Sequence, residues 1–439
     1  MTPIDLTPAL EATAAESLER RGLSRMARAL QPSEILTIAY DVRDRIAQGA
    51  DILNLTVGDF RADQYPLLPE LRSGIIQALE EGHSNYPPAP GVPELRSAVV
   101  DLYARRFGLK YPVDSVLVAG GARPIIAGTY LSLIEPGDPV VFGTPSWNND
   151  HYTALTLAES ILLPTSPESN FFPRVEDLKP HLDRARLIVV NSPQNPTGTM
   201  IREGDLRAMA ELVAEENQRR QRIGQRALYV LFDHIYWMLT FDGAVHKSPV
   251  QLVPELAPYT MHVDGVSKGF AATGLRVGWG VGPTDLIKKM VAVLTHLGTW
   301  APRAEQVATA RVLEDDAVLD RHMKDIRGRA GDRLRALSEA IRAVRAAGHA
   351  VDAIAPEGAI YLSVKFDLLG KKRPDGKIIE NDEDTRSFLL DEAGIALVPF
   401  RAFGAPQAQG WYRASVGTVS VEQCAGVQQR LEKALGQLS

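Results

Sequence analysis

Residues 263–279 read VDGVSKGFAATGLRVGW, a stretch that places one lysine and one arginine among small and apolar residues. Burial of Lys268 in such surroundings would favour its neutral form. That makes it a candidate amine nucleophile, able to form a Schiff base with a carbonyl. Arg276 lies between Gly274 and Gly278, and these glycines would let an anion come close to its guanidinium. Taken alone, the stretch is equally compatible with a surface lysine and arginine beside a turn.

Short apolar runs alternate with helical segments in the part of the chain that leads to this stretch. Continuous runs of this kind predict a parallel sheet with both faces covered. Ligands of such sheets collect beyond the carboxyl ends of the strands. Each run ends in a polar or glycine-rich motif, so we expect the motifs to form one pocket. The runs and their motifs are 115–119 with Gly120-Gly121-Ala122-Arg123, 139–142 with Gly143-Thr144-Pro145-Ser146-Trp147, 187–190 with Asn191-Ser192-Pro193-Gln194-Asn195-Pro196-Thr197-Gly198, 228–232 with Asp233-His234-Ile235-Tyr236, and 260–263 with the lysine stretch.

The segments before the first run have patterns of their own. Residues up to about 30 predict an N-terminal arm with one amphipathic helix, whose apolar positions are Leu10, Ala14, Leu18 and Leu23. Ser33 is a candidate cap for a second helix. The further elements predicted here are helices over 34–47 and 93–107 and a short strand over 52–57.

Residues 304–347 have helical character, with Gly328 and Gly331 as candidate breaks. This helical region is expected to lead into a second, smaller domain of mixed helices and strands. The strands predicted there are 358–364, 396–399 and 411–416.

The chain has 439 residues, a net charge of −6 and one cysteine, Cys424. This length predicts a large domain and a smaller one. The negative charge argues against a nucleic-acid-binding surface, and a single cysteine excludes an internal disulfide and a thiolate metal cluster. The histidines lack the spacing of a zinc site, so no metal is expected. No segment has the length and apolar character of a membrane span or a signal-peptide core, and we expect a soluble cytoplasmic protein.

Together the motifs resemble those of the fold type I pyridoxal-phosphate enzymes, specifically the class I/II (aspartate aminotransferase-like) aminotransferases. N-P-T-G at 195–198, D-x-x-Y at 233–236, S-K-x-x-x-x-x-G-x-R-x-G at 267–278 and a late arginine follow in the family's order. The resemblance implies an α/β fold in which a mostly parallel, seven-stranded sheet lies between helices in a large domain, beside a smaller α+β domain. The expected limits are 1–33 for the arm, 34–62 for the first part of the small domain, 63–315 for the large cofactor-binding domain and 316–439 for the small C-terminal domain.

The resemblance implies pyridoxal 5′-phosphate as the cofactor and gives each residue a role. Lys268 would form the Schiff base and later move the proton between the substrate Cα and the cofactor. Asp233 would pair with the pyridine nitrogen and keep it protonated, which lets the ring act as an electron sink. The other contacts would be Tyr236 and Asn195 on the phenolic oxygen, Trp147 on the ring face, and Gly121, Ala122, Arg123 and Arg276 at the phosphate.

The same resemblance implies where the substrate and a second subunit would bind. Arg413 would hold the substrate α-carboxylate in a two-pronged pair, next to Asn195, and the backbone of Gly58 would line the pocket. Tyr86 resembles a tyrosine that reaches the phosphate of the neighbouring subunit's cofactor, which implies a homodimer with shared sites. The Tyr-Pro-Pro sequence at this position is also typical of an ordinary turn.

Two positions depart from the family's commonest pattern. Gly265 and Val266 stand where a serine often contacts the phosphate, so the phosphate site would depend more on its other residues. Asp150 stands where a histidine commonly supports the pyridine-binding aspartate, and His151 is a candidate substitute. Glu34 lies near the place where dicarboxylate-specific relatives accommodate a second carboxylate, which disfavours a pocket specialised for aspartate.

These observations predict an aminotransferase that moves an amino group from an L-amino acid to a 2-oxo acid in a two-stage, ping-pong cycle. The alternative is another chemistry on the same fold, such as a C–S β-lyase or a ring-forming synthase, because it would share the cofactor residues. A transcription regulator with an aminotransferase-like domain would need a DNA-binding module ahead of Glu34. The arm offers neither the room nor the number of basic residues for one.

Overall fold

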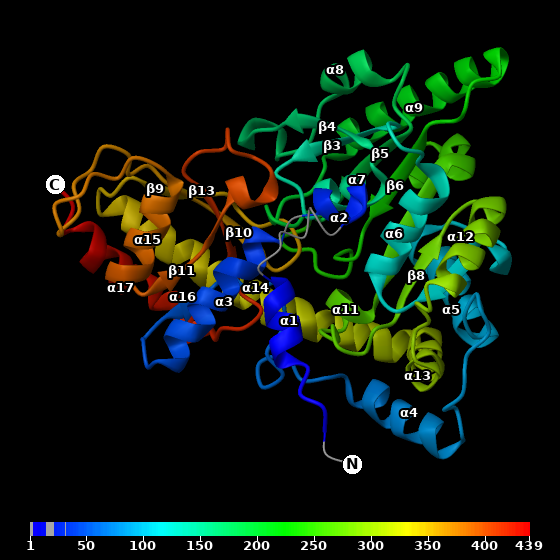
Figure 1. Cartoon of the computed structure of the whole chain (residues 1–439), viewed down its shortest axis with the longest axis horizontal. Helices are drawn as coiled ribbons and strands as arrows, with labels where there is room; N and C mark the ends of the chain where they lie inside the picture. Colours follow the sequence, from blue (N-terminus) through cyan, green and yellow to red (C-terminus); the bar gives the residue numbers. More distant parts are fainter. Residues whose placement is uncertain (1–2, 15–21, 31) are drawn as a thin grey trace.

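The computed structural model describes residues 3–14, 22–30 and 32–439. The strands form a seven-stranded sheet, a four-stranded sheet and a two-stranded pair. In Figure 1 the large sheet and its helices lie on one side of the molecule and the smaller sheets on the other. The strands of the large sheet are β2 (Val116–Ala119), β3 (Pro139–Thr144), β4 (Glu159–Pro164), β5 (Leu187–Asn191), β6 (Tyr229–Asp233), β7 (Thr260–Gly265) and β8 (Gly278–Val281).

The large sheet is mostly parallel, with the strand order β2-β8-β7-β6-β5-β3-β4. The neighbours from β4 through β3, β5 and β6 to β7 are parallel pairs. Only β8 runs the other way, antiparallel to both β7 and β2. The carboxyl ends of all the other strands therefore meet at one edge, which confirms the predicted α/β class and the mostly parallel sheet.

Helices cover both faces of this sheet. Successive residues of a strand point to opposite faces, and in this sheet the residues on both faces are apolar and pack against helices. Val140 and Phe142 of β3 lie in one buried cluster with α6 (Ala122–Leu133) and α12 (Thr284–His296). Val141 lies in another cluster with α9 (Glu203–Ile223). With both faces covered, a ligand can reach the sheet at the strand ends. The other helices of this part are α4 (Pro69–Glu80), α5 (Pro93–Phe107), α7 (Asn149–Thr156), α8 (Val175–Leu178), α10 (Pro249–Leu252), α11 (Val266–Gly269) and α13 (Arg303–Glu314).

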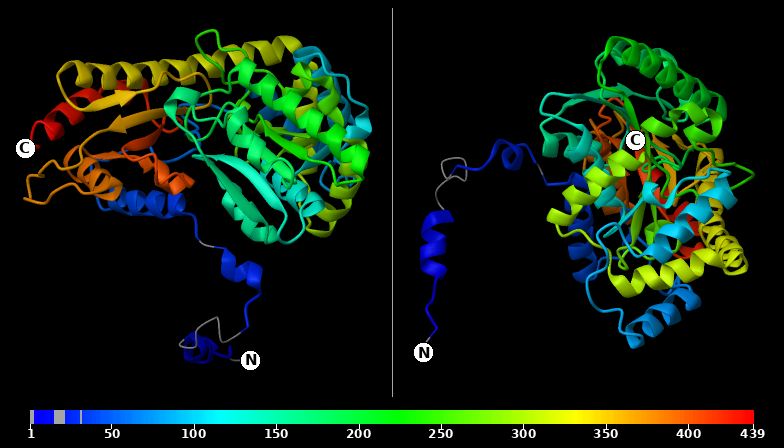
Figure 2. Two further views of the ribbon diagram at one scale, coloured as in Figure 1. Left: turned by 90° about the horizontal axis from the view of Figure 1, so that it is seen from above. Right: turned by 90° about the vertical axis from the view of Figure 1, so that its right-hand side faces the viewer.

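The smaller part brings together segments from both ends of the chain. Its four-stranded sheet is antiparallel, in the order β12-β13-β10-β9, and β1 from the N-terminal part pairs in parallel with β11. The long helix α14 (Asp316–Ala346) packs on this sheet and extends along the large part as well (Figure 2). The remaining elements are β1 (Leu53–Asn54), β9 (Val351–Ala353), β10 (Tyr361–Phe366), β11 (Ile395–Ala396), β12 (Val398–Pro399), β13 (Trp411–Ser415), α3 (Glu34–Ala47), α15 (Asp382–Glu392), α16 (Val421–Ala425) and α17 (Val427–Leu435).

The N-terminal arm differs from the single helix that was predicted. Its described residues contain two short helices, α1 (Thr7–Ala14), which projects away from the rest of the protein (Figure 2), and α2 (Arg25–Ala29), which lies against α7. Ser24 is the N-cap of α2, because its Oγ accepts a hydrogen bond from the Ala27 amide at 3.2 Å. Leu10 is 67% exposed, and Leu23 lies outside both helices. Leu18 lies outside the described residues.

The helices predicted over 34–47 and 93–107 are confirmed as α3 and α5. The helical region after residue 303 breaks at Asp315 instead of at the two glycines. The Asp315 side chain accepts a hydrogen bond from the Val318 amide at 3.0 Å and caps α14, and Gly328 and Gly331 lie inside that helix. Three strands were not predicted, namely β4 and β8 of the large sheet and β9 of the small one. β4 is a largely exposed edge strand, and β8 has the glycine-rich sequence GWGV.

Two helices of the described residues, α9 and α14, are long enough to cross a membrane, but both carry many charged residues. None of the described helices combines the length and the apolar character that a membrane span requires.

Candidate active site

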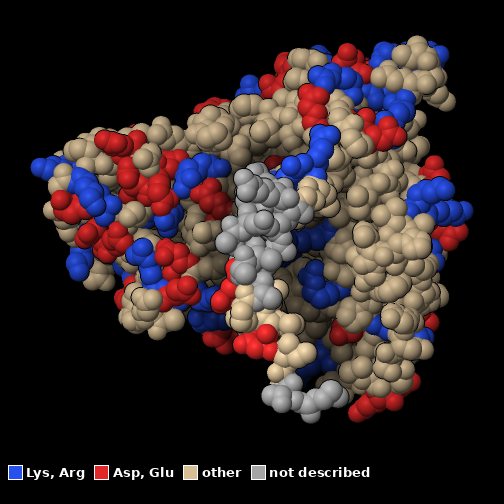
Figure 3. Space-filling model, in the orientation of Figure 1, with Lys and Arg blue, Asp and Glu red and all other residues tan. Residues whose placement is uncertain are grey.

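The predicted motifs lie at the edge of the large sheet where the carboxyl ends of its parallel strands meet. Gly120 and Gly121 follow β2, Trp147 comes after β3, Asn195 comes after β5, Asp233 ends β6, and Lys268 comes after β7. This edge faces the smaller part of the protein. Figure 3 shows Lys and Arg side chains in a hollow between the two parts.

Lys268 lies in the short helix α11 and reaches towards the smaller part. Its Nζ donates a hydrogen bond to the carbonyl oxygen of Gly58 at 2.6 Å. Burial lowers the pKa of Lys268 to about 8, the charge of Asp59 partly opposes this shift, and the positive charges of Arg413 and Arg123 add to it. Roughly a tenth of this amine is therefore neutral at pH 7, far more than for an ordinary lysine, and the neutral form is the one that acts as a nucleophile or a base.

Asp233 is the last residue of β6 and contributes a carboxylate to the same edge. Its Oδ1 accepts one hydrogen bond, from the Ile235 amide at 3.1 Å. Its main-chain oxygen accepts two more, from Asn191 Nδ2 and the Ser192 amide, each at 3.0 Å. Burial raises the pKa of Asp233 to about 6, although the Ile235 amide and the charge of Lys268 oppose the shift. A carboxylate in this state is suited to a cationic N–H partner.

The start of α6 has the geometry of an anion site. Gly121 precedes the helix with a φ of +97°, and the Arg276 guanidinium lies so close to it that a side chain there would collide. Arg276 also has a positive φ, of +57°, and donates to the carbonyl oxygens of Thr273 at 2.7 Å and Gly120 at 2.9 Å. The free amides of the first helical turn, beginning at Ala122, and an exposed guanidinium are therefore adjacent.

Arg413 is a buried cation at the opposite wall, only 1% exposed. Its Nη1 donates to Asn195 Oδ1 at 2.9 Å and its Nη2 to the Thr56 carbonyl at 2.5 Å, while Nε has no partner. The described residues supply no carboxylate to this guanidinium, which lies over the rings of Tyr361 and Phe403 at 4.8 and 4.9 Å. Burial of this guanidinium lowers the pKa of Arg413. A buried cation without an internal counterion favours an anionic ligand.

Two buried tyrosines face each other beside Lys268. The hydroxyls of Tyr236 and Tyr361 are 2.7 Å apart, and burial raises the pKa of both. The pair lies next to Gly58, where an added Cβ would come within 2.7 Å of the Tyr361 hydroxyl. Glycine at position 58 thus leaves room for this hydroxyl close to the carbonyl that holds Lys268.

The sequence motifs did not indicate Tyr361, Asp59 or Phe403. Tyr361 was predicted only as part of the strand 358–364, and Asp59 lies just after the predicted strand 52–57. For two of these residues, the position in the sequence could have indicated a place near the site. Asp59 directly follows Gly58, and Tyr361 lies near the start of the predicted strand 358–364.

Three predicted residues lie further out. The Arg123 guanidinium stacks on the ring of Trp147, 4.5 Å from its centre. Tyr86 is 80% exposed and touches the ring of Trp300, at 5.2 Å between ring centres. The loop of Trp300 reaches the site through its neighbour, since the Gly120 amide donates to the Thr299 carbonyl at 2.7 Å.

The proposed substitute histidine does not support Asp233. His151 Nδ1 lies 2.9 Å from Asp150 Oδ1, so the two residues pair with each other. Glu34 forms an ion pair with Arg401, since its Oε1 lies 2.8 Å from Arg401 Nη2.

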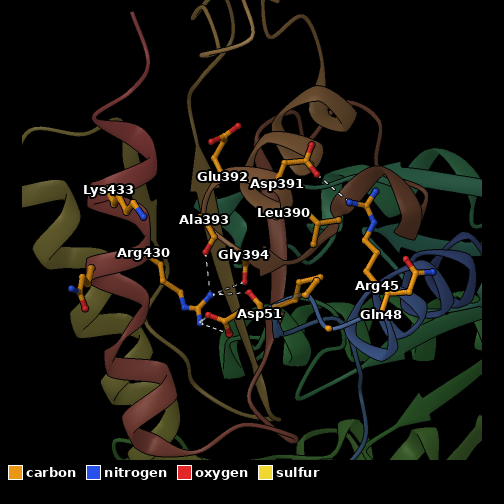
Figure 4. Close-up of a pocket in the computed structure, with 14 residues that line it drawn as sticks. Arg45, Gln48, Asp51, Leu390, Asp391, Glu392, Ala393, Gly394, Arg430 and Lys433 are labelled. Atoms are coloured by element: carbon orange, nitrogen blue, oxygen red, sulfur yellow. Dashed lines mark hydrogen bonds and ion pairs between the residues drawn. The ribbon is translucent and has the colours of Figure 1, made fainter.

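A separate cleft of about 880 Å³ lies among α3, α15 and α17 (Figure 4). Its arginines are already paired. Arg45 Nη1 lies 3.1 Å from Asp391 Oδ1, and Arg430 Nη2 lies 2.7 Å from Asp51 Oδ2. These pairs neutralise the two arginines, so neither of them is an uncompensated cation like Arg413.

The sequence matches the family described as "Aminotransferase class I and II" over residues 50–431. The aspartate/prephenate aminotransferase of Thermus thermophilus is 30% identical over 392 residues, which cover 88% of this chain and 93% of that protein. A probable aspartate/prephenate aminotransferase of Rhizobium leguminosarum bv. phaseoli is 29% identical over 380 residues, or 85% and 90% of the two chains.

Solved structures agree with these relatives. The crystal structure of the aspartate aminotransferase from Rhizobium meliloti has a TM-score of 0.85 and 28% identity, and the match covers 95% of this chain and 99% of that one. The aspartate aminotransferase from Thermus thermophilus with maleate has a TM-score of 0.82 and 27% identity, over 94% and 100%.

Proposed function

The chain belongs to the class I and II aminotransferases, and from that premise we propose that the site around Lys268 is its active centre and binds pyridoxal phosphate. The protein is an aminotransferase. The proposal concerns which residues do the work and which molecules they hold.

Three observations support a fit to pyridoxal phosphate. Lys268 is an amine with a pKa lowered to about 8, which suits it to bond an aldehyde. Asp233 has one hydrogen bond to its carboxylate and a pKa raised to about 6, so it can take the pyridine N–H as a partner. The start of α6 and Arg276 provide adjacent N–H donors for a phosphate. The amine of Lys268, the carboxyl of Asp233 and the donors at the start of α6 would thus match the aldehyde, the pyridine N–H and the phosphate of pyridoxal phosphate.

Arg413 and Asn195 are the residues that would hold the substrate carboxylate. The guanidinium is buried, lacks a counterion among the described residues and keeps Nε without a partner. A carboxylate would satisfy that donor and supply the missing negative charge. The pairing of Arg413 with Asn195 fixes the orientation of the guanidinium before the substrate arrives.

Lys268 would hold pyridoxal phosphate until the substrate amine takes the place of that lysine, and the cofactor would then supply an electron sink for the pair of electrons left when the substrate Cα–H bond breaks. Lys268 would act as the base that takes this Cα proton and returns it, since its lowered pKa keeps a neutral fraction available. Asp233 would hold a proton on the ring nitrogen. Tyr236 and Asn195 would hydrogen-bond the phenolic oxygen, and Trp147 would cover the ring face.

The observation that carries the proposal is the position of Lys268 between an acid, Asp233, and an uncompensated cation, Arg413. This arrangement orients a carboxylate and a Cα–H bond. Among the described residues, no observation favours the lyase alternative. We propose an L-amino acid as the donor and a 2-oxo acid as the acceptor.

A single-turnover experiment tests this proposal. With one amino donor and no acceptor, the purified protein should form one equivalent of oxo acid per site and stop. Adding an oxo acid should restore the original absorbance of the cofactor. Lys268→Ala should bind the cofactor without a covalent link and form no oxo acid. Continuous release of ammonia and pyruvate from a cysteine-like donor would make the lyase alternative right.

We also propose that the protein acts as a homodimer. Tyr86 is exposed, and its ring lies tilted by 60° against the ring of Trp300, in the loop whose Thr299 carbonyl accepts a hydrogen bond from the Gly120 amide. An exposed tyrosine beside a half-buried tryptophan at that place suits a contact with a second subunit. We propose as well that the domains have the limits expected from the sequence, with boundaries after residues 33, 62 and 315.

A further inference from the structure

Tyr361 touches both halves of the site through different parts of its side chain. It begins β10, is fully buried, and places its hydroxyl 2.7 Å from the Tyr236 hydroxyl. Its ring lies under the Arg413 guanidinium at 4.8 Å. Tyr236 belongs to the segment that follows β6 of the large sheet, and Arg413 belongs to β13 of the small one. One side chain thus joins residues of the two sheets.

The main chain holds Tyr361 in place without help from its hydroxyl. The Gly358 amide donates to the Gly198 carbonyl at 3.0 Å, the Ala359 amide to the Leu239 carbonyl at 2.9 Å, and the Val416 amide to the Ile360 carbonyl at 3.0 Å. These bonds fix the start of β10 against the segments that carry Tyr236 and Asn195. Removal of the hydroxyl alone should therefore leave the ring where it is.

The direction of the tyrosine–tyrosine hydrogen bond decides what the hydroxyl does. Each hydroxyl has one proton, so Tyr236 can donate to only one partner at a time. If Tyr236 donates to the cofactor's phenolic oxygen, as the proposed function requires, the 2.7 Å contact must be one in which Tyr361 donates. A donor to the Tyr236 oxygen strengthens the bond that Tyr236 makes in turn.

We propose that Tyr361 is a positioning residue with two separable tasks, and this inference rests on the proposed function. Its hydroxyl donates to Tyr236 and keeps the Tyr236 proton directed at the cofactor. Its ring supports the guanidinium of Arg413 in the position that receives the substrate carboxylate. Tyr361→Phe removes the first task and keeps the second, and Tyr361→Leu removes both.

The absorbance of the bound cofactor provides a readout that a purely structural role would not change. It titrates with the proton on the nitrogen that joins the cofactor to Lys268. A hydrogen bond donated to the adjacent oxygen anion makes this nitrogen less basic. Tyr361→Phe weakens that bond and should raise the midpoint of the titration by about half to one pH unit, with kcat lower by roughly three- to tenfold.

The ring task has its own readout in the Michaelis constants. Tyr361→Phe should leave the KM of the amino donor within about twofold of the wild type, because the ring stays against Arg413. Tyr361→Leu should raise that KM by roughly five- to tenfold in addition to shifting the midpoint.

Tyr412→Phe is the matched control. Tyr412 is fully buried on β13, and its hydroxyl donates to the Asp382 carbonyl at 2.9 Å, away from the site. This variant loses a buried tyrosine hydroxyl and should keep the wild-type midpoint and kcat. An equal midpoint shift in Tyr361→Phe and Tyr412→Phe would overturn the inference.

Tyr236→Phe separates this inference from the proposed function. It removes the donor itself and should shift the midpoint further than Tyr361→Phe does. If Tyr236→Phe shifts the midpoint and Tyr361→Phe does not, the proposed function stands and the role of Tyr361 is wrong. A wild-type protein that shows no absorbance of a cofactor linked to Lys268 would contradict the proposed function instead.

Discussion

Arg413 Nη1 donates a hydrogen bond to Asn195 Oδ1 at 2.9 Å, and this bond joins β13 of the small sheet to the loop after β5 of the large sheet. The Thr56 carbonyl accepts the second Arg413 bond at 2.5 Å. Three segments far apart in the sequence therefore fix one guanidinium. The proposed carboxylate site therefore lies where the two parts of the protein meet.

Replacement of Arg413 should impair both halves of the reaction. We expect Arg413→Ala to lower kcat/KM by roughly 10- to 100-fold for every amino acid and oxo acid, because each presents the same carboxylate. Arg413→Lys keeps the charge but loses the planar fork, so it should recover only part of the loss. Steady-state kinetics of both half-reactions measure this. A loss confined to one substrate would show that Arg413 recognises a side chain instead.

The lowered pKa of Lys268 should be visible in the protein without cofactor. The neutral fraction of a group with a lowered pKa rises as the pH passes that value, so its acylation rate should increase with a midpoint of about 8. An ordinary lysine reacts with a midpoint of about 10.4. Asp59→Asn removes a charge that raises this pKa and should move the midpoint lower still. Mass spectrometry of the labelled peptide reads the rate, and a higher midpoint in Asp59→Asn would be inconsistent with this account.

Asp233 should make the cofactor-free protein less stable at neutral pH. Its folded pKa is raised from 3.8 to about 6, so its favourable contribution is present below about pH 4 and is lost as the pH rises through 6. Asp233→Asn should therefore be more stable than the wild type by about 1–3 kcal/mol near pH 7.5, and equal to it near pH 4. Denaturant unfolding across this pH range measures the difference. The same variant should bind pyridoxal phosphate more weakly, and a destabilised Asn variant at neutral pH would count against the burial argument.

The dimer proposal makes a prediction for Tyr86. Tyr86→Phe should weaken cofactor retention by the worth of about one charge-assisted hydrogen bond, roughly 10- to 100-fold in the dissociation constant, while the dimer persists. Light scattering gives the mass, and dialysis followed by absorbance gives the retained cofactor. A fully active monomer would rule out a shared site.

Much of the fold and the site could be predicted from the sequence, because buried parallel strands are continuous apolar runs with their motifs at one end. Lys268, Asp233 and Asn195 each follow such a run, and the structure brings them to one edge. β4 and β8 lack this signal. β4 lies at the edge with exposed side chains, and β8 consists of alternating glycines with Trp279 and Val281.

The residues from the small part were harder to predict. Tyr361, Asp59 and Phe403 belong to no motif, and their role depends on how the small sheet meets the large one. The helix break at Asp315 was also missed. The Asp315 side chain caps α14 and so fixes where this helix begins. The packing of α14 against the core offsets the cost of Gly328 and Gly331 inside the helix.

The covalent attachment of the cofactor tests the central claim most directly. Borohydride reduction of the protein loaded with pyridoxal phosphate converts the link to a stable secondary amine, and peptide mapping then locates the pyridoxyl group. The account predicts that the group is on Lys268, in the peptide that contains residues 263–279, at about one per chain, and that Lys268→Ala carries none. A pyridoxyl group on any other lysine, with Lys268 unmodified, would contradict it.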